Sequence, residues 1–470
     1  MQSQSIGRGA ASMTLVATLT AMTAIAVFAQ RQSEPEQRAQ TETGGAATSG
    51  SNAPDRTTAA DELEASRVDD MPTASPAERA IAVAREAISK APKSFEAHNA
   101  LGMALARRAR ETADPAFYDR SDAALQRSLE LEADNFPARL LGVWNQLGRH
   151  EFAAALVAAK ALNERAKDDL LVYGMLVDAN VELGNYADAE QAAQWMLNLR
   201  PGTPAAMTRV SYLRELFGDI EGACQAMTMA FHSTRPTEFE DRAWMLTHLA
   251  HLELERGKTE AGLAQARAAL ALFPDYHYAL ASLGAAHSLR GEWQEAVAAY
   301  QRRYEVAPHP ENLYDLAVAV EAAGDADRAT SMYTAFEAAA LEESENQDNA
   351  NLQLAEYWLD HTQDAEKWAR ALAQLEARGA VRQDVGTLEL LGWARYRTGD
   401  VEAAQAELQR AVAVGSVNAR LRRRAGEVAA AAGDLDAARV SMELAYRQSP
   451  TSDGGRAARR WLMAHPGPNE

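Results

Sequence analysis

The sequence predicts an all-α protein in which short helix–turn–helix units stack into a solenoid. Residues 277–310 show the unit most clearly, because apolar side chains recur three and four positions apart over 278–290 and again over 293–306. That spacing is typical of amphipathic helices, and Gly291 stands in the break between the two patterns. The unit returns at intervals of about 34 residues, as expected of repeat proteins whose core grows lengthwise.

The turns between the helices carry the clearest signal. Most turns place Asp, Asn or Glu directly after a glycine; Gly favours the left-handed backbone that ends a helix, and the next side chain caps the following helix. The turn glycines are Gly148, Gly184, Gly218, Gly257, Gly291, Gly324, Gly399 and Gly433. A small residue follows each glycine by five positions, where we expect the two helices of a unit to approach closely. These residues are Ala153, Ala189, Ala223, Gly262, Ala296, Ala329, Ala404 and Ala438.

The first 29 residues predict an export signal. Arg8 precedes an apolar run over 13–29 that ends in small residues, which is typical of a signal peptide cut after Ala29. An uncleaved membrane anchor over 12–29 is the alternative, because the run is nearly long enough to span a bilayer. Both interpretations place the rest of the chain outside the cytoplasm, in the periplasm or a similar compartment, either soluble or tethered.

Residues 30–74 contain almost no large apolar side chains. Such a segment cannot bury enough surface to offset the entropy of ordering, so we expect a disordered linker. The ordered array is expected over 75–464. Its expected parts are a half-repeat cap at 75–92, full repeats over about 95–452, a capping helix at about 453–464 and then a tail at 465–470.

The repeated unit resembles the tetratricopeptide repeat, a helix–turn–helix of about 34 residues. The matching positions in the clearest unit are Leu283, Gly284, Gly291, Ala296, Tyr300 and Pro308. Residues 351–372 and 388–404 are also similar to uncharacterised bacterial proteins of this family. The resemblance implies a right-handed superhelical solenoid of about ten repeats, preceded by the signal or anchor helix and the linker. Insertions at 110–120 and 232–242, and a turn at 361–363 without Gly, depart from the pattern.

In this family the first helices of successive repeats line a concave groove, where partner proteins dock. By register, the aromatic and histidine side chains that would face the groove are Tyr212, Trp244, His251, Tyr278, Tyr314, Tyr357, Trp393 and Tyr396. Tyr and Trp are favoured at binding surfaces because they bury a large area at low entropic cost. The alternative is that several of them fill the core between helices.

The net charge of −19 argues against a nucleic-acid partner, because an acidic surface repels phosphate groups. Two small basic clusters, 422–424 and 459–460, are interpreted as solvated helix faces. The single cysteine, Cys224, is interpreted as a small core residue.

Neither a metal site nor a catalytic site is predicted. His248, His251 and Glu255 share one helix face, but the spacing of a zinc protease helix is absent, and a packed and a surface histidine explain them better. The sequence contains no Gly-rich phosphate loop and no nucleophile elbow, and no span outside the array is left for an enzyme domain. We therefore expect no cofactor.

The sequence predicts a non-catalytic scaffold that binds a protein segment or assembles a cell-envelope complex through its groove. The alternative is an accessory factor in envelope polysaccharide export, or a carbohydrate-binding solenoid that uses the same aromatic side chains. The partner is expected to be a protein or peptide, and membrane attachment is expected only through residues 12–29. Functional differences are expected near 232–242, along 244–255 and in the unit after Leu341.

Overall fold

The computed structural model describes residues 75–343 and 352–466. The regular secondary structure of these residues is entirely α-helical, which confirms the all-α prediction for them. The predicted signal or anchor at 1–29 and the predicted linker at 30–74 lie outside the described residues, as does most of the tail. Within the described ranges, no helix combines the length and the apolar character that crossing a membrane requires.

Ten helix pairs follow one another along the described chain. The first five are α4 (Phe95–Thr112) with α5 (Ala116–Leu131), α6 (Phe136–Gly148) with α7 (Phe152–Arg165), α8 (Leu170–Leu183) with α9 (Tyr186–Leu199), α10 (Pro204–Leu216) with α11 (Ile220–Ser233), and α12 (Phe239–Glu255) with α13 (Thr259–Leu272). The other five are α14 (His277–Arg290) with α15 (Trp293–Val306), α16 (Pro310–Ala322) with α17 (Ala326–Glu343), α18 (Leu352–His361) with α19 (Ala365–Gly379), α20 (Val385–Arg397) with α21 (Val401–Ala413), and α22 (Ala419–Ala431) with α23 (Leu435–Gln448). A single helix stands at each end, α3 (Pro76–Lys90) and α24 (Asp453–Ala464).

Helices that are consecutive in the chain pack on each other throughout. The first helices of successive pairs are also in contact, for example α8 with α10 and α12 with α14. This is the nearest-neighbour packing of a solenoid. Alanines supply much of the interior, since a small side chain lets the helices of a pair approach. Ala189, Ala223 and Ala404 are fully buried at the positions expected from the repeat.

The first predicted turn differs from the others. Gly148 does not have a positive φ; His150 does, at 65°, so this turn lies two residues later in the sequence than expected. The small buried residue moves by the same two positions, from the exposed Ala153 to the fully buried Ala155. Packing requires a glycine at position 148 instead, because a Cβ there would overlap the ring of Tyr118.

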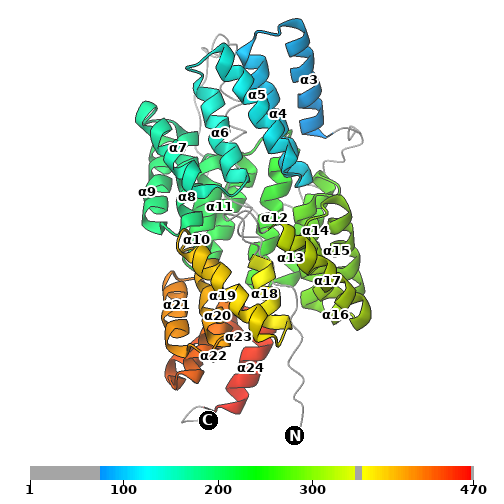
Figure 1. The fold of residues 1–470 in the computed structure, drawn as a ribbon, viewed down its shortest axis with the longest axis vertical. Helices are drawn as coiled ribbons and strands as arrows, with labels where there is room; N and C mark the ends of the chain where they lie inside the picture. The colour runs from blue at the N-terminus through cyan, green and yellow to red at the C-terminus, as the bar shows by residue number, and fades with distance from the viewer. Residues whose placement is uncertain (1–74, 344–351, 467–470) are drawn as a thin grey trace, which may run out of the picture.

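The array coils so tightly that segments about 200 positions apart in the sequence touch each other (Figure 1). The first of these long-range contacts lies near the N-terminal end of the array. Arg110, near the end of α4, pairs with Glu240 and with Asp241 at 3.3 Å, both in the first turn of α12. The Nε2 atom of His277, at the start of α14, lies 3.1 Å from the carbonyl oxygen of Arg110. Both partners of Arg110 are buried, so this joint is part of the core rather than a surface contact.

A second set of contacts joins the C-terminal pairs to the middle of the array. The N–H of Gln383 donates to the carbonyl oxygen of Leu183 at 3.1 Å, and Gln448 Nε2 donates to that of Glu255 at 3.0 Å. We call this the inter-turn seam; it is formed by residues 382–385, 415–418 and 448 against the turns that follow α8, α10 and α12. The seam brings distant parts of the coil together around its inner face, which forms a partly open cavity.

Candidate partner-binding cavity

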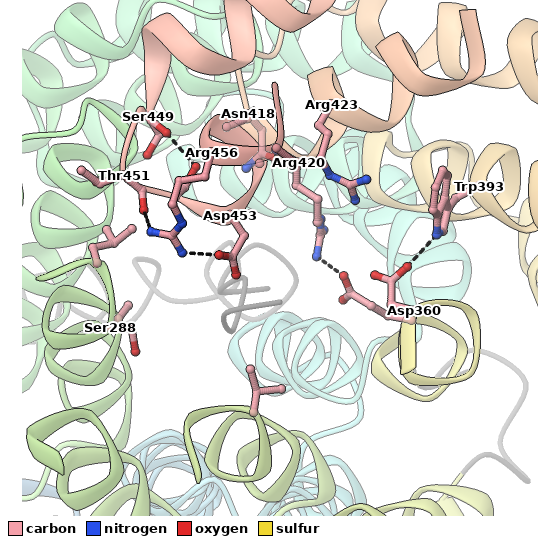
Figure 2. A pocket seen from close by; sticks show the side chains of 18 of the residues that line it. Ser288, Asp360, Trp393, Asn418, Arg420, Arg423, Ser449, Thr451, Asp453 and Arg456 are labelled. Carbon is pink, nitrogen blue, oxygen red and sulfur yellow. Dashed lines mark hydrogen bonds and ion pairs between the residues drawn. The ribbon is translucent and has the colours of Figure 1, made fainter. Parts of the chain in front are cut away.

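A cavity of about 940 Å³ lies inside the coil. We call it the central cavity; its wall is made by the first helices of six consecutive pairs, α12 to α22, and by α24. In Figure 2, Asp360 and Trp393 lie on one side and Arg456 with Asp453 on the other, with Arg420 between them. First helices of successive pairs therefore line one inner surface, which forms a partly open cavity.

A buried ion network fixes one side of the central cavity. Arg424 of α22 is fully buried and donates to Glu389 at 2.7 Å and to Glu356 at 3.1 Å. It also donates to Asp360 at 2.7 Å, and Asp360 accepts a further hydrogen bond from Trp393 Nε1 at 2.7 Å. Burial alone would raise the pKa of Asp360, but the attraction of Arg424 outweighs it and lowers the pKa to about 2. The network thus holds α18, α20 and α22 in one arrangement.

A second buried charge cluster lies where α10 meets α12. The carboxylate of Glu215 lies 3.2 Å from His248 Nε2 and 2.7 Å from His251 Nε2. Burial opposes the charge on His251, but Glu215 outweighs it and raises the pKa of His251 to about 9. Glu255 is directed away, toward Asn418 Nδ2 at 3.3 Å. The described residues contain no group of three or more His, Cys, Asp or Glu side chains arranged to hold a metal ion.

Half of the side chains expected to face the groove line the central cavity. These are His251, Tyr314, Trp393 and Tyr396. Tyr212 lines, together with His251, a second cavity of about 110 Å³ beneath the inter-turn seam. The ring of Tyr396 is only half-buried, so it offers the cavity more aromatic surface than the nearly covered Trp393.

The remaining three expected residues line neither cavity. Trp244 is buried and stacks on His248 with ring centroids 5.8 Å apart, and Tyr278 is buried among neighbouring rings. Tyr357 is half-buried and stacks on Tyr333 with centroids 5.1 Å apart. The alternative stated from the sequence, that several of these aromatics fill the core, describes these three.

The basic side chains of the cavity were not among the residues singled out from sequence. The cluster 422–424 was interpreted as a solvated face, yet Arg424 is fully buried and Arg423 lines the cavity. Arg456 and Arg460 of α24 line it too. A signal was present: Arg420, Arg423, Arg424 and Glu427 recur three and four positions apart, so they share one helix face.

Comparison with known proteins bears on the repeat itself. A family model described as Tetratricopeptide repeat matches residues 248–312 and 389–453. These two segments are similar to tetratricopeptide repeats. The first matched segment includes α14 and the C-terminal part of α12, and the second includes α22 and most of α20; all four helices contribute to the cavity wall. No curated protein matches this chain.

Solved structures show only a distant likeness to the tetratricopeptide array. The structure of Naa15/Naa10 bound to HypK-THB has 16% identity and a TM-score of 0.27, over 78% of this chain and 65% of that one. The APC/C hetero-tetramer Cut9–Hcn1 has 15% identity and a TM-score of 0.46, over 81% and 66%. The human IFIT1 dimer with PPP-AAAA has 11% identity and a TM-score of 0.45, over 77% and 86%. This chain spans just under two thirds of the first two, and all three scores lie below 0.5.

Proposed function

We propose that the protein is a non-catalytic scaffold that binds a segment of a partner protein in the central cavity. The observation that carries the proposal is the wall of that cavity, to which seven helices from successive repeats contribute side chains. Tetratricopeptide repeats suggest a protein-interaction scaffold. A concave, mixed polar and apolar space is the usual form of a binding site.

The lining offers both kinds of contact that a peptide segment requires. Tyr396 presents a half-buried aromatic ring, and Leu254 and Val318 add apolar surface from α12 and α16. Arg423 and Arg460 add guanidinium groups, which donate to carboxylates and to main-chain carbonyl oxygens alike. Aromatic and arginine side chains are the residues that most often dominate binding energy at protein interfaces.

The buried ion network beside the cavity supports a non-catalytic role, although burial raises the pKa values of two lining carboxylates, Glu255 and Asp453. Burial would raise the pKa values of Asp360 and Glu389, but both are lowered by neighbouring arginines. A general acid or base works best when its pKa lies near the working pH, and these two carboxylates are held ionised instead. Their place in a buried ion network is typical of structural charges.

Photo-crosslinking in intact cells tests the binding site. With a photoreactive amino acid in place of Tyr396, we expect capture of a discrete partner band. The matched control replaces Trp195 of α9, an exposed ring outside the central cavity, and is expected to capture little. Equal capture from both positions would overturn the assignment of the cavity.

We propose further that the scaffold acts outside the cytoplasm, where it assembles a cell-envelope complex. The support is the sequence of residues 1–29, which is typical of an export signal or anchor. Cell fractionation with N-terminal sequencing of the recovered protein tests this. A mature chain starting at Gln30 is expected for a cleaved signal, whereas recovery with cytoplasmic proteins would contradict the proposal.

The second candidate is carbohydrate binding, or a role in polysaccharide export, and one surface feature favours it. Trp195 is 48% exposed and stacks on Tyr173 with ring centroids 6.1 Å apart. Gln191, Gln194 and Asn198 flank it and provide amide donors and acceptors. Titration with cell-wall glycans should quench tryptophan fluorescence in the wild type and not in Trp195→Ala; no quenching across a glycan panel would exclude this function.

A further inference from the structure

In the central cavity the carboxylates have hydrogen-bond or ion-pair partners, whereas two of the arginines have no carboxylate partner within the part of the chain that the structure describes. Each lining carboxylate has a cationic, amide or hydroxyl partner; these carboxylates are Glu255, Glu321, Glu356, Asp360, Glu427 and Asp453. Arg460 has neither a hydrogen bond nor an ion pair with any described residue. Arg397 donates only to the carbonyl oxygens of Leu359 and Thr362. The cavity therefore has guanidinium groups available to carboxylates, and its own carboxylates are already engaged.

Apolar surface also contributes to the wall of the central cavity. Leu254 of α12, Ala285 and Leu289 of α14 and Val318 of α16 contribute to the lining. Arg397 and Arg460 come from α20 and α24, which form a different part of the wall. An occupant that satisfies both sides carries several carboxylates and a few apolar side chains spaced along one short segment.

The chain itself contains such a segment directly before α3. Residues 61–70 read DELEASRVDD, with five acidic side chains and one arginine, and Leu63 and Val68 are spaced among them. The cavity is also within its reach. Ser75 caps α3 and bonds Glu111 of α4, and the adjacent Arg110 pairs with the first turn of α12.

Helix α12 runs from that joint to the central cavity. From Glu240 to Glu255 it covers about 22 Å at 1.5 Å per residue. The stretch from Ala65 to Ser75 can extend to at most about 34 Å, which exceeds the length of α12 with allowance for the joint, whereas the stretch from Asp70 to Ser75 extends to only about 17 Å. Residues 61–65 can therefore reach the cavity, and Asp69 and Asp70 stay closer to the joint. Charge, apolar spacing and reach therefore agree on one occupant.

We propose that residues 61–65 of the same chain, the N-terminal half of this acidic segment, occupy the central cavity, with their carboxylates on Arg397 and Arg460. The inference rests on the proposed function, because the same cavity would receive the partner. The segment then competes with the partner, and the partner binds by displacing it. Partner affinity is consequently set by the difference between two occupants of one site.

Photo-crosslinking within the full chain tests the proposal. A photoreactive amino acid at Leu63 is expected to crosslink, within one chain, to the α12–α14 and α20–α24 helices, read by mass spectrometry. The same group at Ala47, in the same N-terminal region, serves as the matched control and should label no preferred helix. Labelling from Leu63 as diffuse as that from Ala47 would overturn the proposal. Crosslinks found only between chains would overturn it in favour of a second copy as the occupant.

Charge reversal separates this inference from the proposed function. Arg460 is exposed and, among the described residues, unpaired, so Arg460→Glu should leave folding intact. We expect this substitution to lower the Leu63 crosslink yield about fivefold or more. Glu62→Arg together with Glu64→Arg in that variant should restore the yield. If Tyr396 captures a partner while Leu63 never reaches the cavity, the scaffold stands and the internal occupant is wrong. If Leu63 crosslinks as expected while Tyr396 captures no partner, the scaffold is wrong.

Discussion

The guanidinium of Arg382 binds both the main-chain carbonyl oxygen and the carboxylate of Glu182, although 200 positions separate the two residues. Its Nε donates to the carbonyl oxygen of Glu182 at 3.0 Å, and its Nη2 donates to the carboxylate at 2.7 Å. Both side chains are about 95% buried. The pair lies in the inter-turn seam, so it joins two turns of the coil that nearest-neighbour packing would leave apart.

Breaking this pair should open the seam. Glu182→Ala removes the carboxylate at 2.7 Å from the buried Arg382 and leaves it a carbonyl acceptor and the longer pair with Asp384 at 3.4 Å. We therefore expect a loss of about 3 kcal/mol in the free energy of unfolding. Replacing both residues, as Glu182→Leu with Arg382→Met, should recover most of that loss. Chemical denaturation measures it, with Glu86→Ala as control, because the Glu86–Lys90 pair is exposed and worth well under about 1 kcal/mol. A single-variant effect no larger than the control would contradict the role of the seam.

A glycine in the seam provides an independent measurement. Gly184 and Gly291 both end a helix in the left-handed conformation, with φ of 81° and 73°. A Cβ at Gly184 would lie 2.5 Å from the main chain of Gln383, whereas a Cβ at Gly291 would meet nothing within 4 Å. Gly291→Ala should therefore cost only backbone strain, about 1–2 kcal/mol, and Gly184→Ala about 1–3 kcal/mol more. Equal losses in denaturation of the two variants would show that the turns are not in firm contact.

The sequence correctly predicted helix boundaries, which depend on interactions between residues close to one another in the chain. Turn glycines followed by capping residues, such as Gly399 with Asp400 and Gly433 with Asp434, gave correct helix boundaries because these effects act within a few residues. The prediction failed in detail at Gly148, where contact with Tyr118 requires a glycine and the left-handed residue of the turn is His150, two positions later.

The central cavity depends instead on contacts between residues far apart in the sequence, and repeat periodicity does not encode these contacts. The pairing of Glu182 with Arg382 and of Glu255 with Asn418 depends on how tightly the coil winds. That winding is the sum of small rotations over many units. It decides which inner side chains face a cavity and which become core, so Tyr396 and Trp244 differ in environment although both were expected in the groove.

The His251–Glu215 pair should make stability depend on pH in the alkaline range. Glu215 raises the pKa of His251 from 6.5 to about 9 in the folded state, against the effect of burial, while His248 and Glu255 lie close by. A raised pKa means that the stabilisation is complete below pH 6.5 and is lost as the pH rises through 9. We expect the free energy of unfolding to fall by up to about 3 kcal/mol over that window.

Denaturation at pH 6 and pH 9.5 measures the effect. His251→Gln should remove most of the difference between the two pH values. His232→Gln, at an exposed position on α11, should leave the difference as it is in the wild type. If His251→Gln keeps the full difference, the alkaline loss of stability arises elsewhere.

The two arginines at 423 and 424 of α22 should differ sharply, although the sequence places them side by side. Arg424 is fully buried and bonds Glu356, Glu389 and Asp360. Arg424→Met leaves Asp360 without its ion-pair partner, and leaves Glu356 and Glu389 with Arg420 alone. We expect a loss of about 3–5 kcal/mol, since an unpaired buried charge is the costly state. Arg423 pairs only with the half-buried Glu427, and Arg423→Met should cost less than about 1 kcal/mol.

Arg424→Lys then separates charge from geometry at the same site. Lysine keeps the positive charge but cannot place separate donors on two carboxylates in a fixed fork, so its loss should lie between those of the other two variants. Thermal unfolding of the three variants gives the order. Equal stability of Arg424→Met and Arg423→Met would show that the network does not hold α18, α20 and α22 together, and the cavity wall would then lack its fixed side.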